Sequence, residues 1–317
     1  MGRLSDGGGD EVSGVVGTGR SAAAAWRVHG LSVRGYRHVQ QGLPCQDAWG
    51  QACAGPPGAR ITVLAVADGA GSRPRSEEGA HLAIRLATSV FGRHLASFAT
   101  APDGPGEPGE PGGPGEPGEG NTLARLQRDA FREVRDSFLD DTRELAGGRG
   151  GPADFATTLT VLALGPGWVG HTSLGDGFAV LRAGETDGAP QFHLLPQPEP
   201  PGEYGNETTF LSSPDAVARV RIDCVRDDEV DGVLLSTDGL AQAALSTADG
   251  PGGPVPNRSF ATSVLRALDR PGPDPQADAD DLGALLRSHR LTALNADDKT
   301  LVRAVRGARQ DWGRGLL

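Results

Sequence analysis

Three Asp-Gly pairs each follow an apolar run typical of a β-strand: ITVLAVADG holds Asp68, HTSLGDG holds Asp176, and GVLLSTDG holds Asp238. A fourth acidic site, NADDKTLVRAV, places Asp297 and Asp298 directly before another apolar run. A single Asp-Gly pair is usually only a turn. A carboxylate at the inner end of a buried strand, however, loses water and needs a cation, an arginine or several N–H donors. Four such sites on neighbouring strands predict clustered oxygen ligands, which suit Mg²⁺ or Mn²⁺ better than zinc.

The elements that must position these carboxylates follow from hydrophobic periodicity. Strand-like runs are found at 26–33, 49–53, 61–67, 155–164, 168–174, 178–182, 216–222, 232–236 and 300–305. Ser76 is predicted to begin one long helix and Asn121 to cap a second, and shorter helices are predicted over 239–246, 258–269 and 280–289. Consecutive strands joined by short turns favour antiparallel sheets covered by the long helices. The pattern therefore predicts an α+β layered sandwich.

The composition of the 317 residues restricts the possible partners and location. The net charge of -11 argues against a general nucleic-acid binder, because such proteins use clustered Lys and Arg to neutralise phosphates. The three cysteines, Cys45, Cys53 and Cys224, form no C-x-x-C pair, and this sparse, odd count is typical of a reducing compartment. No apolar signal core and no stretch near ~18 apolar residues is present. We therefore expect a cytoplasmic protein without a membrane partner.

The chain divides into one folded domain and three flanking or inserted segments. Residues 1–24 are glycine- and alanine-rich and are predicted to be a disordered lead, residues 25–306 a single domain, and residues 307–317 a C-terminal tail. A Gly/Pro/Glu-rich stretch at 102–120 contains DGPGEPGEPGGPGEPGE and is predicted to be a flexible, self-repelling insertion. Its G-E-P triplets resemble collagen, so a collagen-like assembly protein is a minor alternative.

Six segments, taken in order, resemble one family. They are GYRHVQQGLPCQDAWG, VLAVADGAGSRPRSEEGAHLA, FATTLTVLAL, SLGDGFAVL, VLLSTDGL and DDKTLV. From about residue 26 to 306, omitting the insertion, the chain is similar to the metal-dependent serine/threonine protein phosphatases of type 2C, and most to their bacterial branch. The resemblance implies a four-layer αββα sandwich of two mainly antiparallel β-sheets flanked by helices, with a metal centre at one end of the sheets.

The resemblance also implies a mechanism and a set of metal ligands. Two divalent cations, Mn²⁺ or Mg²⁺, would lower the pKa of a shared water that attacks phosphoserine or phosphothreonine in line, without a phosphoenzyme. Asp68 would bridge the two ions, and the carbonyl of Gly69 would bind one of them. Asp238 and Asp297 would bind the other ion, and Asp176 would join Asp238 at a third, weaker ion.

Asp47, in the QDA segment, would hold the water network beside the metals, and Asp298 would support the ligands from behind. Two positions depart from the family pattern. Many relatives carry an acidic residue where this chain has Gln46, and a phosphate-gripping arginine where it has Gly42. A catalytically weak relative, which binds phosphoprotein or metal with little turnover, is therefore the main alternative function.

Other side chains are candidates to grip the substrate phosphate. Arg37 and His38 lie on the same approach as Gly42, and His38 has either this role, a leaving-group role or a purely structural one. Arg73 and Arg75, just after the Asp68 turn, are more typical of solvated surface charge.

The resemblance implies a phosphorylated protein as substrate, and an opposing serine/threonine kinase is a candidate partner. Two other phosphatase classes do not fit the residues. A haloacid-dehalogenase-type enzyme needs a D-x-D motif after the first strong strand, but Asp68 is followed by Gly69 and Ala70. A tyrosine-phosphatase loop needs C-x5-R, and no cysteine here has an arginine six positions on.

Overall fold

The computed structural model describes five stretches of the chain, residues 26–100, 119–197, 208–247, 253–269 and 275–307. The expected disordered lead lies outside these residues. So do most of the expected insertion over 102–120 and all but the first residue of the expected tail over 307–317. The domain boundaries proposed for these segments therefore stay predictions.

Two five-stranded antiparallel sheets form the centre of the protein. The first sheet has the order β1-β12-β9-β6-β7, with bounds Trp26–Val33, Lys299–Arg306, Val230–Ser236, Phe178–Thr186 and Ala189–Leu194. The second has the order β2-β3-β4-β5-β8, with bounds Asp47–Ala54, Ile61–Asp68, Leu159–Gly165, Trp168–Leu174 and Arg221–Arg226. A small separate ribbon pairs β10, Leu245–Thr247, with β11, Pro254–Pro256.

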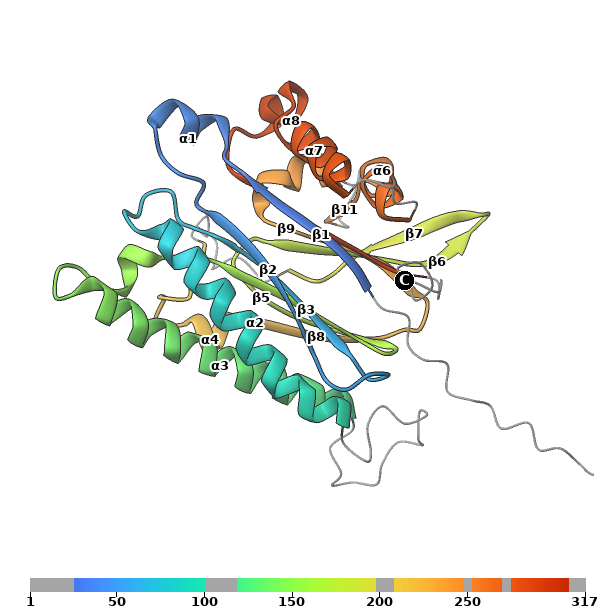
Figure 1. Cartoon of the computed structure of the whole chain (residues 1–317), viewed down its shortest axis with the longest axis horizontal. Coiled ribbons are helices and arrows are strands. Elements are labelled where there is room, and N and C mark those ends of the chain that lie inside the picture. The colour runs from blue at the N-terminus through green and yellow to red at the C-terminus, as the bar shows by residue number, and fades with distance from the viewer. Residues whose placement is uncertain (1–25, 101–118, 198–207, 248–252, 270–274, 308–317) are drawn as a thin grey trace, which may run out of the picture.

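Helices cover the outer face of each sheet (Figure 1). The long helices α2, Ser76–Thr100, and α3, Glu119–Ala146, lie over the second sheet. The first sheet is covered by α6, α7 and α8, with bounds Arg258–Asp269, Pro275–Leu286 and His289–Leu294. The layer order helix–sheet–sheet–helix confirms the predicted αββα sandwich. No helix in the described stretches is long and apolar enough to span a bilayer.

Three apolar clusters hold these layers together: one under α2 and α3, one under α6 to α8, and one between the sheets. Strand β3 shows how one sequence serves two of them. Successive strand residues point to opposite faces, so Val63, Ala65 and Ala67 join the cluster under the long helices, whereas Leu64 and Val66 join the cluster between the sheets. An unbroken apolar run is therefore needed here, because both faces of the strand are buried.

Several predicted elements differ from the structure at their ends. The strand predicted from residue 155 begins at Leu159, because Pro152–Phe155 forms a 3-10 turn in which the proline ring occupies the first position. The strand predicted over 216–222 is wrong in its first half, where Ala216–Arg219 forms the short helix α4 before β8 begins. Asn121 does not cap α3, because the helix already includes Glu119.

Several short elements were not predicted, among them β7, β11, α1 (Tyr36–Gln41) and nearly all of α8. Strand β7 is a partly exposed edge strand with an irregular register against β6, so it lacks a strong apolar signal. Helix α1 is only six residues long and has no side-chain N-cap. It ends at Gly42, whose left-handed backbone (φ 67°) is the usual way to end a helix. The remaining short helix, α5, spans Ala241–Ala244.

Candidate active site

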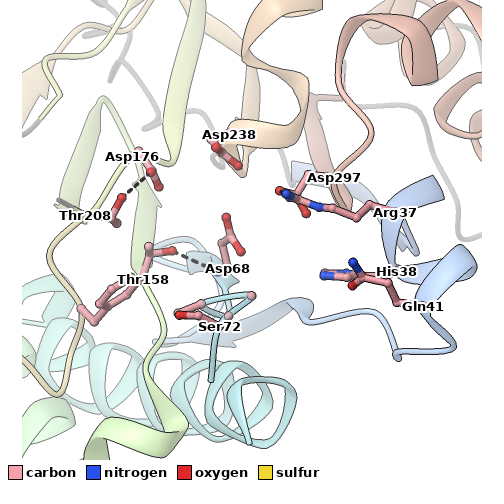
Figure 2. A pocket seen from close by; sticks show the side chains of 14 residues that line it. Arg37, His38, Gln41, Asp68, Ser72, Thr158, Asp176, Thr208, Asp238 and Asp297 are labelled. Carbon is pink, nitrogen blue, oxygen red and sulfur yellow. Dashed lines mark hydrogen bonds and ion pairs between the residues drawn. The ribbon is translucent and has the colours of Figure 1, made fainter. Parts of the chain in front are cut away.

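A cavity of about 480 Å³ opens where loops from both sheets meet (Figure 2). Its walls come from helix α1, the loop after β3, the residue before β4, the loop after β5, residues 208–210, the end of β9 and the turn before β12. Because the two sheets are stacked, segments far apart in the sequence reach this one end. The cavity therefore lies where the Asp-Gly pattern predicted a cluster.

Four of the predicted carboxylates line this cavity: those of Asp68, Asp176, Asp238 and Asp297. Asp68 is the last residue of β3, Asp176 lies between β5 and β6, Asp238 directly follows Thr237 after β9, and Asp297 precedes β12. Figure 2 shows Asp68, Asp176 and Asp238 pointing into a common space, with Asp297 on the other side beside Arg37. The side chains thus converge from four strand ends.

Burial and mutual repulsion raise the pKa values of two of these acids, Asp68 and Asp238. Burial raises the pKa of Asp68 well above its usual range, and the charges of Asp47, Asp238 and Asp176 raise it further. Burial also raises the pKa of Asp238 to about 6, with the charge of Asp176 adding to the effect, while a hydrogen bond from Asp68 opposes it. Desolvated like charges so close together require either shared protons or a cation.

The donor set fits hydrated hard cations. No three carboxylate, imidazole or thiolate groups among the described residues converge tightly enough to hold an ion by themselves. Mg²⁺ and similar ions, however, keep several waters and are often bound by only one or two carboxylates. The hydrogen-bonded pair of Asp68 and Asp238 offers this number of ligands. Oδ1 of Asp176 is buried without a partner, and its Oδ2 accepts a hydrogen bond from Thr208 at 2.9 Å.

Asp47 does not line the cavity but lies behind Asp68, its partner in the β2–β3 ladder. Its Oδ2 accepts hydrogen bonds from the hydroxyl groups of Thr237 at 2.7 Å and Thr300 at 2.9 Å. Burial raises the pKa of Asp47 to about 7, although these two hydroxyl donors oppose the shift. Its carboxylate therefore ties three strand ends together beneath the site.

Two glycines allow the backbones of these loops to approach one another closely. A Cβ on Gly35 would lie 2.2 Å from the carbonyl carbon of Asp297, and a Cβ on Gly239 would lie 1.9 Å from the carbonyl oxygen of Asp298. Neither position has room for any side chain. Gly239, which follows Asp238, is thus required because the two backbones pack so closely. The Asp-Gly pair therefore marks the site here, although the same pair elsewhere usually indicates only a turn.

Helix α1 supplies the opposite wall of the cavity through Arg37, His38 and Gln41. The guanidinium of Arg37 pairs with the carboxylate of Asp297. His38 is almost fully buried, and its Nδ1 lies 2.9 Å from Oδ2 of Asp298. The structure therefore places both predicted substrate-contacting residues at the cavity.

The other predicted arginines do not line the cavity. Arg75 is engaged elsewhere: its guanidinium pairs with Glu78, donates to the carbonyl of Leu145, and lies 4.1 Å from the ring centre of Phe155. Arg73 is exposed. Arg73 agrees with the surface-charge interpretation, whereas Arg75 is partly buried in structural contacts.

The two departures from the family pattern have distinct surroundings. Gly42 closes α1 in a left-handed conformation, where an arginine would be strained. Gln46 is buried, and its Oε1 has no hydrogen-bond partner. A buried amide oxygen without a hydrogen-bond partner is unusual.

Sequence reasoning missed several polar residues of the cavity wall, namely Gln41, Ser72, Thr158 and Thr208. The Oγ1 of Thr158 accepts a hydrogen bond from the N–H of Asp68 at 3.0 Å. It also faces the cavity. Nothing in the local sequence distinguishes these side chains from other polar residues, because only the folded chain brings them to one place.

Comparisons with known proteins agree with this geometry. The family profile named Protein phosphatase 2C matches residues 34–287. Serine/threonine-protein phosphatase 3 of Escherichia coli strain K12 is 28% identical over 288 residues, which cover 89% of this chain and 98% of that protein. The structure of serine-threonine phosphatase 2C from Toxoplasma gondii is similar with a TM-score of 0.55 at 13% identity, covering 90% of this chain and 96% of that one. A bacterial serine phosphatase has a TM-score of 0.51 at 14% identity, covering 90% and 100%. These matches confirm the resemblance seen in the sequence: the chain belongs to the protein phosphatase 2C family.

Proposed function

We propose that this protein hydrolyses phosphoserine and phosphothreonine in proteins, with two divalent cations, Mn²⁺ or Mg²⁺, bound in the cavity. The observation that supports this most strongly is the convergence of Asp68, Asp176, Asp238 and Asp297 around one cavity. The pKa values of Asp68 and Asp238 are raised there. Family membership points to the same reaction. When bound, such cations activate water for attack on phosphorus and offset the charge of the phosphate.

The residues of this chain would divide the work by position. Asp68 and Asp238 would hold the cations, with the carbonyl of Gly69 and the carboxylate of Asp297 as further ligands. Asp176 would serve a third, weaker ion. Asp47 would fix the ends of β2 and β3 from behind, because it is buried between two hydroxyl donors.

The α1 wall would hold the substrate. A phosphate seated in the cavity would lie between the carboxylates that would hold the cations and the side chains of Arg37, His38 and Gln41. Arg37 pairs with the carboxylate of Asp297, but its side chain is about half exposed. Its guanidinium can therefore still contact a phosphate oxygen at the mouth of the cavity.

The test is manganese-dependent hydrolysis of p-nitrophenyl phosphate and of a phosphothreonine peptide by wild type, Asp68→Asn and Asp238→Asn. We expect turnover that requires the metal and is lost in both variants. Wild-type protein that binds Mn²⁺ without turnover would instead favour the catalytically weak alternative, which is motivated by Gln46 and Gly42. Failure to bind Mn²⁺ or Mg²⁺ at all would contradict both.

The partner would be a phosphorylated protein, and an opposing serine/threonine kinase would supply that substrate. All three cysteines are free thiols, which supports a reducing compartment such as the cytoplasm. Fractionation of cells followed by detection of the protein tests this placement.

A further inference from the structure

Asp298 is a buried carboxylate, 3% exposed, with three contacts to two segments of the chain: α1 with its N-cap residue, and the residue before β2. Its Oδ1 accepts a hydrogen bond from the N–H of Gly35 at 2.6 Å, and its Oδ2 accepts one from the N–H of Gln46 at 2.6 Å. Two backbone donors fix the position and plane of the carboxylate. The third contact is with Nδ1 of His38, 2.9 Å from Oδ2.

His38 connects this buried charge to the cavity. The ring lines the cavity although the side chain is only 4% exposed. Nδ1 faces Asp298, whereas Nε2 would lie 3.9 Å from a Cβ placed on Gly71, in the loop that follows Asp68. Figure 2 shows the ring directed from α1 toward the space in front of Asp68. One nitrogen is therefore paired with a carboxylate and the other faces the reaction space.

At this ring orientation Nδ1 of His38 and the carboxylate of Asp298 do not have the geometry of a hydrogen bond. Their contact is therefore mainly electrostatic. The carboxylate lies 2.9 Å behind Nδ1 and holds the ring so that Nε2 keeps facing the cavity.

We propose that Asp298 is a positioning residue, which holds His38 so that Nε2 delivers a proton to the leaving serine or threonine oxygen; this rests on the proposed hydrolysis. In this step a water oxygen bonds to phosphorus while the bond from phosphorus to the side-chain oxygen breaks. The electron pair of the broken bond goes to that oxygen, which takes the proton from Nε2. The proton lost by the attacking water then returns to the imidazole through solvent, and the products are the alcohol and inorganic phosphate.

Leaving groups of different basicity distinguish this role from a structural one. A serine or threonine alkoxide is strongly basic and needs a proton as it departs, whereas p-nitrophenolate departs readily without one. General acid catalysis contributes about 10²–10⁴-fold to rates when it is needed. A structural defect would instead lower both activities alike.

The experiment compares kcat and KM for a phosphothreonine peptide and for p-nitrophenyl phosphate, at saturating Mn²⁺, in wild type, His38→Ala, Asp298→Asn and the double variant. We expect each single variant to lose about 100-fold or more in kcat on the peptide but only a few-fold on p-nitrophenyl phosphate. The double variant should be no slower than His38→Ala, because Asp298 acts through the ring that is already absent.

Asp278→Asn is the matched control. Oδ2 of Asp278 lies 2.8 Å from Nδ1 of His29 and 2.7 Å from a guanidinium nitrogen of Arg303. The variant therefore breaks a contact between a carboxylate and a histidine together with an arginine contact, and none of these three residues lines the cavity. This variant should change both activities equally and only slightly. Thermal unfolding of all variants shows which of them are folded.

Two results would overturn the inference: equal losses on both substrates for Asp298→Asn, or losses that add fully to those of His38→Ala. If Asp298→Asn does not fold, His38→Ala still decides, since an equal loss on both substrates removes the leaving-group role. Wild-type protein that hydrolyses neither substrate refutes the proposed function instead, so the two failures are distinguishable.

Discussion

Replacing Asp238 with asparagine separates the stability of the metal-free protein from its activity. Burial, together with the charge of Asp176, raises the pKa of Asp238 from 3.8 to about 6. That difference of about two units corresponds to about 3 kcal/mol, at ~1.36 kcal/mol per unit. Because the folded state disfavours the ionised form, this free energy is lost as the pH rises from about 4 through about 6. An asparagine has no charge and can keep a hydrogen bond with Asp68.

We therefore expect Asp238→Asn to raise the free energy of unfolding by up to about 3 kcal/mol at about pH 8, and to have little effect at about pH 4. Urea unfolding with EDTA, followed by tryptophan fluorescence, measures both values. Adding Mn²⁺ should reverse the order, because a ligand that binds the folded state of wild type more tightly stabilises it more.

Asp140→Asn is the control for this prediction, since its side chain is 77% exposed on α3 and lies outside the cavity. It should change stability by less than about 0.5 kcal/mol at either pH. A variant Asp238→Asn that is less stable than wild type at about pH 8, or equally stabilised at both pH values, would refute the reasoning about repulsion.

Three further predictions concern the support of the site. Gly239→Ala would place a Cβ 1.9 Å from a carbonyl oxygen and should lower the free energy of unfolding by about 1–3 kcal/mol, whereas Gly151→Ala, with nothing within 4 Å, should not; urea unfolding compares the two. Thr300→Val removes a hydroxyl donor from Asp47 and raises its pKa further, so stability should fall by about 1 kcal/mol at about pH 8 and less at about pH 5; equal losses at both would contradict this. Arg37→Ala should lower kcat/KM for a phosphopeptide about 10–100-fold, as expected for a charge-assisted contact, with an unchanged melting temperature because the side chain is exposed; a lower melting temperature would instead indicate a structural role.

The sequence was informative where one residue type has one strong physical reason to be in its place. A short, continuous apolar run is typical of a strand that is buried on both faces of its sheet. For this reason β3, β5 and β9 were predicted nearly to their ends. An aspartate at the end of such a run must meet a cation or a donor, which marked Asp68 and Asp238. The ordered motifs then identified the family, as the comparisons confirm.

Short or partly exposed elements were not predictable from local pattern. The six-residue helix α1 has no side-chain cap, and its apolar residue Val39 is exposed. Its hydrophobic periodicity therefore does not indicate a helix. It is held by contacts with distant residues, including the hydrogen bond from the N–H of Arg37 to the carbonyl of Ala296. The edge strand β7 likewise depends on its neighbour β6.

The sequence by itself determined most of the buried strands, the family and the acidic residues at the strand ends, because burial and desolvation restrict residue type and spacing. Only the tertiary structure decided which of these acids share the cavity. It placed Asp47 behind the cavity wall and Asp176 in the wall itself. It also brought His38 into contact with Asp298, although most of the chain separates them in sequence. The physical reason is that strand ends meet through sheet pairing and stacking, and the distances set by these contacts are not encoded in any local stretch.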